Sequence, residues 1–215
     1  MLLFLILLIP CALVFYCLER RDSRIVPVMF IGLMCATAYS LIRLIFFYSH
    51  RVIPDSFFLN FIYYYLRLSL IPNLVIYSLY CLLTKGSMEF KVNSFFPLMG
   101  VFYAIFIPYN VVAFTDSIYS GYDLFLKPAL YLAMLVEFTI CLKKFFAIKE
   151  GKISGNKTVC IILMALYSIF PAVIDSLYAM DKFFYLSLPL CILYIVFPFI
   201  TVVGKAKLLF NSAAE

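Results

Sequence analysis

The chain has 215 residues, of which 66% are hydrophobic and only 13% are charged. A soluble domain carries about 25% charged residues to keep its surface hydrated, so this composition excludes an ordinary soluble protein. The net charge is +6, and most of the basic residues lie in short loops between apolar runs. That distribution is typical of membrane anchoring, and we do not expect the protein to bind nucleic acid.

Long apolar runs bounded by charged residues predict an all-α polytopic membrane protein, because a bilayer-spanning helix needs roughly 20 apolar residues. The content of only 7 Gly and the lack of alternating polar residues argue against an outer-membrane barrel. We expect a bundle of seven transmembrane helices, at Leu2 to Leu18, Ile25 to Tyr48, Phe57 to Thr84, Phe95 to Phe114, Leu124 to Phe146, Thr158 to Met180 and Phe183 to Val203. They make one transmembrane domain over residues 1–204, followed by a short basic cytoplasmic tail over residues 205–215.

The basic residues predict the orientation, because short cytoplasmic loops hold the excess of Lys and Arg. With the N-terminus outside, twelve basic residues fall on the inner side and only Arg51 and Lys182 fall on the outer side. We therefore expect an outer N-terminus and a cytoplasmic C-terminus, in a cytoplasmic (inner) or plasma membrane. The first run is interpreted as a helix rather than a cleaved signal peptide, since it lacks a basic start and the charged segment 19–24 follows it directly.

Neither a disulfide framework nor a metal or haem site is expected. The seven cysteines lie within apolar runs without a C-x-x-C pair, and His50 is the only histidine in the sequence. This single histidine excludes the seven-helix zinc hydrolases, and the absence of Lys from Phe183 to Val203 excludes a retinal protein. No set of nucleophile, base and metal is visible, so we predict no cofactor and no enzymatic activity.

Prolines interrupt several of the predicted spans, and each one removes a backbone hydrogen bond. Two of them stand close to an asparagine: Pro72 precedes Asn73, and Pro108 precedes Asn110 by two residues. Such a polar side chain either repairs the broken turn or lines a cavity. Both interpretations stay open at this stage.

Five ionisable residues fall inside the predicted spans, where an unpaired charge is costly. Arg43, Arg67, Lys127 and Asp175 belong to the outer half of four different spans, whereas Glu137 is near the midplane. Charges that share a depth while coming from different helices predict a polar pocket that opens outward. Of the two arginines, Arg67 is too deep to reach the interface easily, so we expect it to pair with Asp175.

Helical spacing adds tyrosines to this level, because residues three or four apart share one face of a helix. The candidate ligand-binding residues are Arg43, Tyr63, Tyr64, Arg67, Lys127, Tyr131, Asp175 and Tyr178. Their excess of cations favours a ligand with a carboxylate or phosphate, including a lipid head group. An internal ion pair that only fixes helix register is the alternative interpretation, and Glu137 is the candidate for proton coupling in a transporter.

Three functional classes follow. The first is a receptor-like or sensor module that binds a small anionic or lipid-like ligand, surrounded by membrane lipids and acting on a cytoplasmic output domain or partner subunit. At the level of topology, the chain resembles the seven-helix sensor modules that bacteria place before cytoplasmic output domains. The second class is a solute or lipid transporter or its substrate-binding subunit, and the third is a non-catalytic subunit of a membrane complex.

Topology can be tested with reporter fusions after Lys91 and after Lys157. With the N-terminus outside, Lys91 follows three predicted spans and Lys157 follows five. An odd number of crossings ends on the inner side, so both fusions should report a cytoplasmic location. If the fusion after Lys157 is exported while the one after Lys91 is not, one of the two predicted spans between them is wrong.

Overall fold

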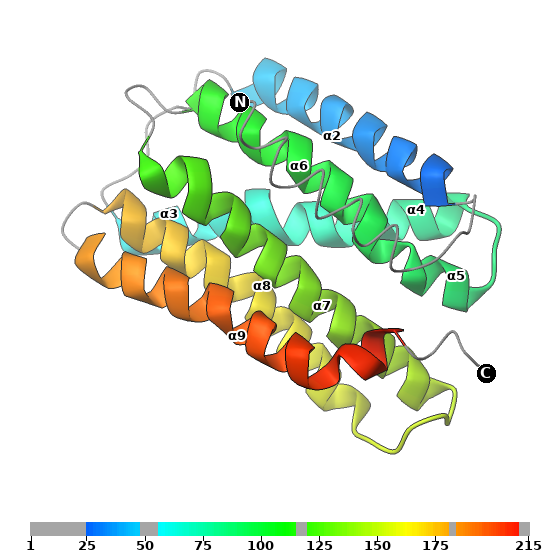
Figure 1. Cartoon of the computed structure of the whole chain (residues 1–215). Helices are drawn as coiled ribbons and strands as arrows, with labels where there is room; N and C mark the ends of the chain where they lie inside the picture. The colour runs from blue at the N-terminus through cyan, green and yellow to red at the C-terminus, as the bar shows by residue number, and fades with distance from the viewer. Residues whose placement is uncertain (1–24, 48–55, 115–119, 181–183, 211–215) are drawn as a thin grey trace.

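The computed structural model describes residues 25–47, 56–114, 120–180 and 184–210, and these are helical except at short turns (Figure 1). The α-helices and the π-helical segments, labelled η, follow in the order α2 (Ile25–Phe47), α3 (Phe57–Tyr64), η1 (Tyr65–Leu70), η2 (Pro72–Ile76), α4 (Tyr77–Leu83), α5 (Met88–Asn93), α6 (Phe95–Phe114), η3 (Tyr122–Leu126), α7 (Lys127–Lys149), α8 (Lys157–Ala179) and α9 (Phe184–Phe210).

Five helical stretches are long and apolar enough to cross a membrane. They are Ile25–Ile45, Phe57–Leu83, Met88–Val111, Tyr122–Lys149 and Lys157–Ala179, and a shorter apolar stretch, Tyr185–Pro198, lies in α9. The protein is therefore an all-helical chain with the helices of a membrane protein. The predicted span Leu2 to Leu18 lies outside the described residues, so the count of seven and the orientation stay predictions.

The predicted ends of the helices agree with the structure to within three residues, with one exception. The last helix, α9, runs to Phe210, which is beyond the predicted end of that span at Val203 and inside the predicted tail. The two apolar runs on either side of Asp181 and Lys182 form separate helices, α8 and α9, that pack against each other as a hairpin (Figure 1).

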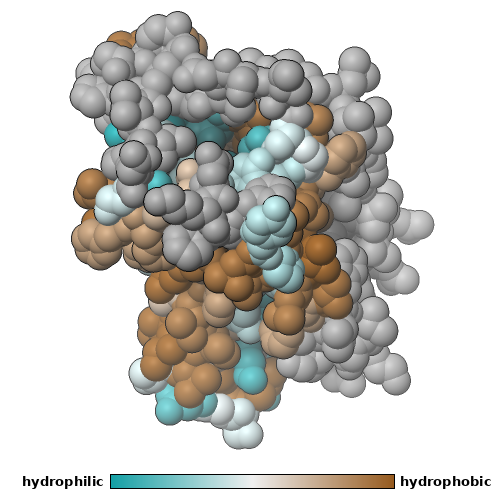
Figure 2. All heavy atoms as spheres, turned by 90° about the vertical axis from the view of Figure 1, so that its left-hand side faces the viewer, coloured by the Kyte–Doolittle hydropathy of each residue, from teal (hydrophilic) through white to brown (hydrophobic). Residues whose placement is uncertain are grey.

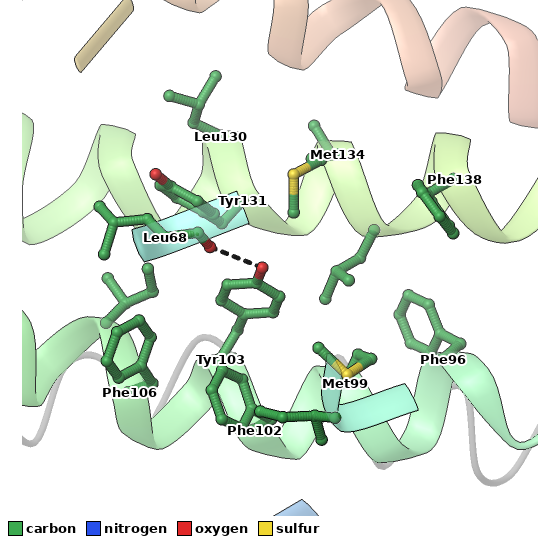
Figure 3. Packing of buried hydrophobic residues seen from close by; sticks show 14 of the residues in the cluster. Leu68, Phe96, Met99, Phe102, Tyr103, Phe106, Leu130, Tyr131, Met134 and Phe138 are labelled. Atoms are coloured by element: carbon green, nitrogen blue, oxygen red, sulfur yellow. Dashed lines mark hydrogen bonds between the residues drawn. The ribbon is translucent and has the colours of Figure 1, made fainter. Parts of the chain in front are cut away.

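Two helices make the centre of the bundle. Between 61% and 67% of the most apolar window is buried in the stretches that contain α7 and α6, against 28% to 33% in the other three. Their apolar residues are spread around the whole helix, as expected for a helix enclosed by others. Aromatic rings from both helices interlock between them, for example Tyr103 and Tyr131 with centroids 5.5 Å apart (Figure 3).

The outer helices turn apolar side chains away from this core. Phe30 and Ile45 on α2 are 60% and 73% exposed, and Leu193 on α9 is 69% exposed. Figure 2 shows mostly hydrophobic side chains over the described part of one face, with more hydrophilic residues between them. Such a surface is stable in contact with lipid tails rather than with water.

Small residues bring α2 close to α6, the helix against which it packs most extensively. Gly32, Ala36 and Ser40 follow one another at four-residue spacing, and all three are buried. A Cβ atom added at Gly32 would overlap the backbone carbonyl of Leu98 on α6. Small residues at this spacing allow the backbones of membrane helices to approach each other.

Pro72 interrupts the long helix that runs from α3 to α4, and two tyrosines compensate for the missing N–H. A proline at this position cannot donate to the carbonyl of Leu68 in an α-helical turn or to that of Arg67 in a π-helical turn. The Tyr103 hydroxyl donates to the Leu68 carbonyl oxygen at 2.7 Å (Figure 3), and the Tyr39 hydroxyl donates to the Arg67 carbonyl oxygen at 3.1 Å. Side chains from α6 and α2 thus supply hydrogen bonds that Pro72 cannot donate.

The same arrangement recurs in α8. Pro171 leaves the carbonyl of Tyr167, four residues earlier, without its helical donor. The Tyr194 hydroxyl from α9 donates to that oxygen at 3.0 Å. Asn73 does not repair its own turn, because its Oδ1 accepts a bond from Tyr103 at 3.3 Å and so supports the tyrosine that does.

We predict that Gly32→Ala lowers the free energy of unfolding by about 1–3 kcal/mol, because the new methyl group must push α2 away from α6. Gly100→Ala on α6 is the matched control, since a Cβ there meets only the Phe96 ring at 3.9 Å and Ala favours a helix. The two variants are compared by unfolding in detergent. If both variants change the free energy of unfolding equally, the close approach of α2 to α6 at Gly32 does not determine how the two helices pack.

We predict that Tyr103→Phe destabilises the bundle by about 1–2 kcal/mol, because it removes the hydroxyl that satisfies a buried carbonyl. The loss should be smaller in a Pro72→Ala background, where residue 72 regains an N–H and can donate to Leu68. Tyr65→Phe removes a hydroxyl from η1, in the helix that Pro72 interrupts, and serves as the control. If Tyr103→Phe costs as much stability in the Pro72→Ala background as in the wild type, the Tyr103 hydroxyl does not compensate for the proline.

Candidate functional site

Four of the five ionisable side chains predicted inside the spans lie in two groups that touch each other. We call Asp175, Lys127, Tyr122 and Tyr131 the Asp175 cluster, and Arg43, Arg67, Tyr63 and Asn110 the arginine cluster. Asp175, Lys127, Arg43 and Asn110 are all buried, between 1% and 6% exposed. The charges of Asp175, Lys127 and Arg43 must therefore be stabilised within the protein rather than by water.

The Asp175 carboxylate is held from three directions. Oδ1 accepts a hydrogen bond from Tyr122 at 2.8 Å, and Oδ2 accepts one from Tyr131 at 2.8 Å. The Lys127 ammonium lies 3.5 Å from Oδ1. Lys127 and Tyr131 are one turn apart on α7, which places both opposite the same carboxylate on α8.

The arginine cluster is built around one tyrosine. Arg43 on α2 donates from Nη1 to Asn110 Oδ1 on α6 at 2.5 Å and from Nη2 to the Tyr63 hydroxyl at 3.2 Å. The guanidinium carbon of Arg67 lies 4.4 Å from the centroid of the Tyr63 ring, which is a cation–π contact. Two cations thus contact the two ends of Tyr63, and they are close enough to repel each other.

Tyr64 connects the two clusters. Its ring meets that of Tyr63 edge to face, with centroids 5.3 Å apart, and the Lys127 ammonium lies 5.2 Å from the Tyr64 centroid. Polar and aromatic side chains therefore form a continuous belt from α2 and α6, through α3, to α7 and α8. The structure brings together the residues predicted at this level, while their binding of a ligand stays a prediction.

Tyr178 lies at the edge of the Asp175 cluster. Its ring stacks on that of Tyr122 with centroids 3.8 Å apart, and its hydroxyl donates to Ser120 Oγ at 2.5 Å. Ser120 in turn donates to Asp123 Oδ2 at 2.7 Å. Tyr178 is thus connected to Asp175 through Tyr122 and does not contact the carboxylate itself.

The chain matches no protein-family model, no curated protein and no solved structure. Its function therefore has to be argued from the geometry of this belt.

The predicted pairing of Arg67 with Asp175 is wrong, because the cation beside Asp175 is Lys127. Side chains of a helix lean toward its N-terminus. The guanidinium of Arg67 accordingly lies back over the ring of Tyr63, four residues earlier. Lys127 begins α7 one turn before Tyr131 and lies opposite α8, so it reaches the carboxylate instead.

Tyr122 was missed in the sequence because its spacing is not that of an α-helix. It precedes Lys127 by five residues, and the segment between them, η3, is π-helical. In a π-helix, residues five apart share a face, so Tyr122 and Lys127 both reach Asp175. Pro128 follows Lys127 directly, and because a proline cannot donate to the carbonyl four residues earlier, it is the sequence signal for a departure from α-helical spacing here.

Glu137 belongs to neither cluster. It is 4% exposed and lies ten residues after Lys127, or about 15 Å along α7. Its electrostatic neighbours include Tyr167 and Tyr194, the two residues joined at the Pro171 break. Its proton-coupling role stays a prediction, with these tyrosines as its surroundings.

We predict that Lys127→Met costs about 3 kcal/mol or more of stability, because it leaves the Asp175 carboxylate buried without its cation. Adding Asp175→Asn should recover part of this loss. In contrast, Arg67→Met and Asp175→Asn should be additive to within about 0.5 kcal/mol. Two double-mutant cycles in detergent measure both couplings, and a larger coupling for Arg67 than for Lys127 would contradict the geometry.

Proposed function

We propose that the chain is an integral membrane, receptor-like module that binds a small anionic or lipid-like ligand at the arginine cluster, from the outer side of the membrane. The observation that carries the proposal is the convergence of two guanidinium groups, from Arg43 and Arg67, on a single tyrosine. Two neighbouring cations in a membrane favour an anion between them, and the planar guanidinium matches a carboxylate or phosphate in two-point contact.

The Asp175 cluster supports the same choice of site. Lys127 already faces a carboxylate at 3.5 Å, and both oxygens of that carboxylate accept tyrosine hydroxyls. An incoming anion would have to compete with Asp175 there. In the arginine cluster two guanidinium groups contact a neutral hydroxyl, a ring and an amide, and together they supply the planar donors that a carboxylate or phosphate accepts.

A ligand at Arg67 would act directly on the broken helix. Arg67 is part of η1, and its carbonyl is the one held by Tyr39. Isolated π-helical turns are frequent at functional sites and mark places where a helix can change register. A change in η1 would pass through η2 to α4, where Lys91 of α5 donates to the Cys81 carbonyl oxygen at 2.6 Å.

This inner end is where an output domain or partner subunit would read the change. Tyr77 also donates to the Lys91 carbonyl oxygen at 3.0 Å, so two hydrogen bonds join α4 to α5. A ligand shifts such an equilibrium only by binding one state better than the other. We infer that a ligand held by Arg67 binds one state better than the other, because Arg67 belongs to the segment that would move.

The proposal is tested by thermal unfolding of the purified full chain in detergent with carboxylates, phosphates and neutral analogues. A ligand at 100 times its Kd adds about 2.7 kcal/mol of stability, which raises Tm measurably. We predict stabilisation by an anion, its loss in Arg67→Gln and its retention in Lys144→Gln, which removes the same charge from an exposed position of α7.

If an anion raises the Tm of the wild type and of Arg67→Gln equally, the proposed site is wrong. If no anion raises the Tm of the wild type, the proposed function is wrong. Accumulation of the bound anion inside proteoliposomes would make the protein a transporter instead of a receptor.

A further inference from the structure

Asn60 on α3 is a buried amide without a protein partner in the described part of the chain. Its side chain is 1% exposed, and neither Nδ2 nor Oδ1 has a hydrogen-bond partner there. The other two buried asparagines are both engaged, since Asn73 binds Tyr103 and Asn110 binds Arg43. An amide has two donors and an acceptor, and leaving them all unpaired in a protein interior is costly.

The amide stands next to the proposed anion site. Tyr63 follows Asn60 by three residues, Tyr64 by four and Arg67 by seven, so all share one face of α3 and η1. The guanidinium of Arg67 lies back over the Tyr63 ring, with its carbon 4.4 Å from the centroid. Asn60 therefore lies one helical turn before Tyr63, the residue whose ring the charged group of Arg67 covers.

From this juxtaposition we propose that Asn60 binds a hydroxyl group of the ligand whose anionic group lies at the arginine cluster. The inference rests on the proposed function and names the chemical class of its ligand. A hydroxyl both donates and accepts, as the unpaired amide requires. The ligand is thus a hydroxylated phosphate or carboxylate, either as a free solute or as the head group of a lipid.

The test compares glycerol phosphate with propyl phosphate, which has the same chain and charge without the hydroxyls. Wild-type protein in detergent should bind glycerol phosphate about tenfold more tightly. Asn60→Leu should bind both probes with the affinity that the wild type has for propyl phosphate. Asn93→Leu, an exposed position of α5, should keep the tenfold preference.

The stability of the free protein is a second readout. Leu has nearly the shape of Asn and no unpaired polar atoms, so Asn60→Leu should unfold no earlier than the wild type without ligand. A gain in free stability together with a lost hydroxyl preference separates a ligand contact from a structural amide. A large loss of free stability would overturn the proposal, since the amide would then have a structural partner.

The outcomes for the two hypotheses differ. If both probes bind equally to the wild type and both lose binding in Arg67→Gln, the role of Asn60 is wrong and the anion site stands. A tenfold preference for glycerol phosphate that survives in Asn60→Leu also overturns the role of Asn60. An ordered water, and not the ligand hydroxyl, then binds the Asn60 amide in the wild type. If neither probe stabilises the wild type, the anion site itself fails.

Tighter binding of lysophosphatidic acid than of glycerol phosphate would identify a lipid as the source of the ligand, and equal binding would identify a free solute.

Discussion

Asp175 carries a carboxylate into the interior of a bundle whose outer faces are apolar, and the surrounding helices are arranged to neutralise it. Water cannot hydrate the charge at this position, so α7 supplies Lys127 and Tyr131 while η3 supplies Tyr122. These three contacts set the register of α7 against α8. The Lys127 ammonium also meets the ring of Tyr64, which brings α3 and the arginine cluster into the same level.

Tyrosine hydroxyls perform the second task that the membrane imposes, the satisfaction of backbone carbonyls at proline breaks. Tyr103 and Tyr39 serve the break at Pro72, and Tyr194 serves the one at Pro171. Tyrosine suits this role because its ring packs in an apolar core while its hydroxyl reaches a polar atom. The chain has 17 Tyr and no Trp, so tyrosine is the aromatic residue that supplies these hydrogen bonds.

The helices could be predicted from the sequence because the length and bounding charges of an apolar run determine a membrane helix almost by themselves. The assembly of Arg43, Arg67, Lys127 and Asp175 into one belt followed from the cost of burying a charge. Their pairing did not, because it depends on the direction in which Arg67 leans and on the turn at which α7 begins. Tyr122 stayed hidden because five-residue spacing belongs to a π-helical turn. The count of seven spans, the orientation and the ligand stay predictions.

The central claim is that the buried charge of Asp175 is neutralised within the protein by Lys127. Solid-state NMR on protein in lipid bilayers, with ¹⁵N in the lysine side chains and ¹³C in the aspartate carboxyls, measures this contact directly. The Lys127 Nζ to Asp175 Oδ1 distance of 3.5 Å predicts strong dipolar dephasing between the two labels, which Lys127→Met abolishes. An Asp175 signal without dephasing, or one that Lys127→Met leaves unchanged, would contradict the account.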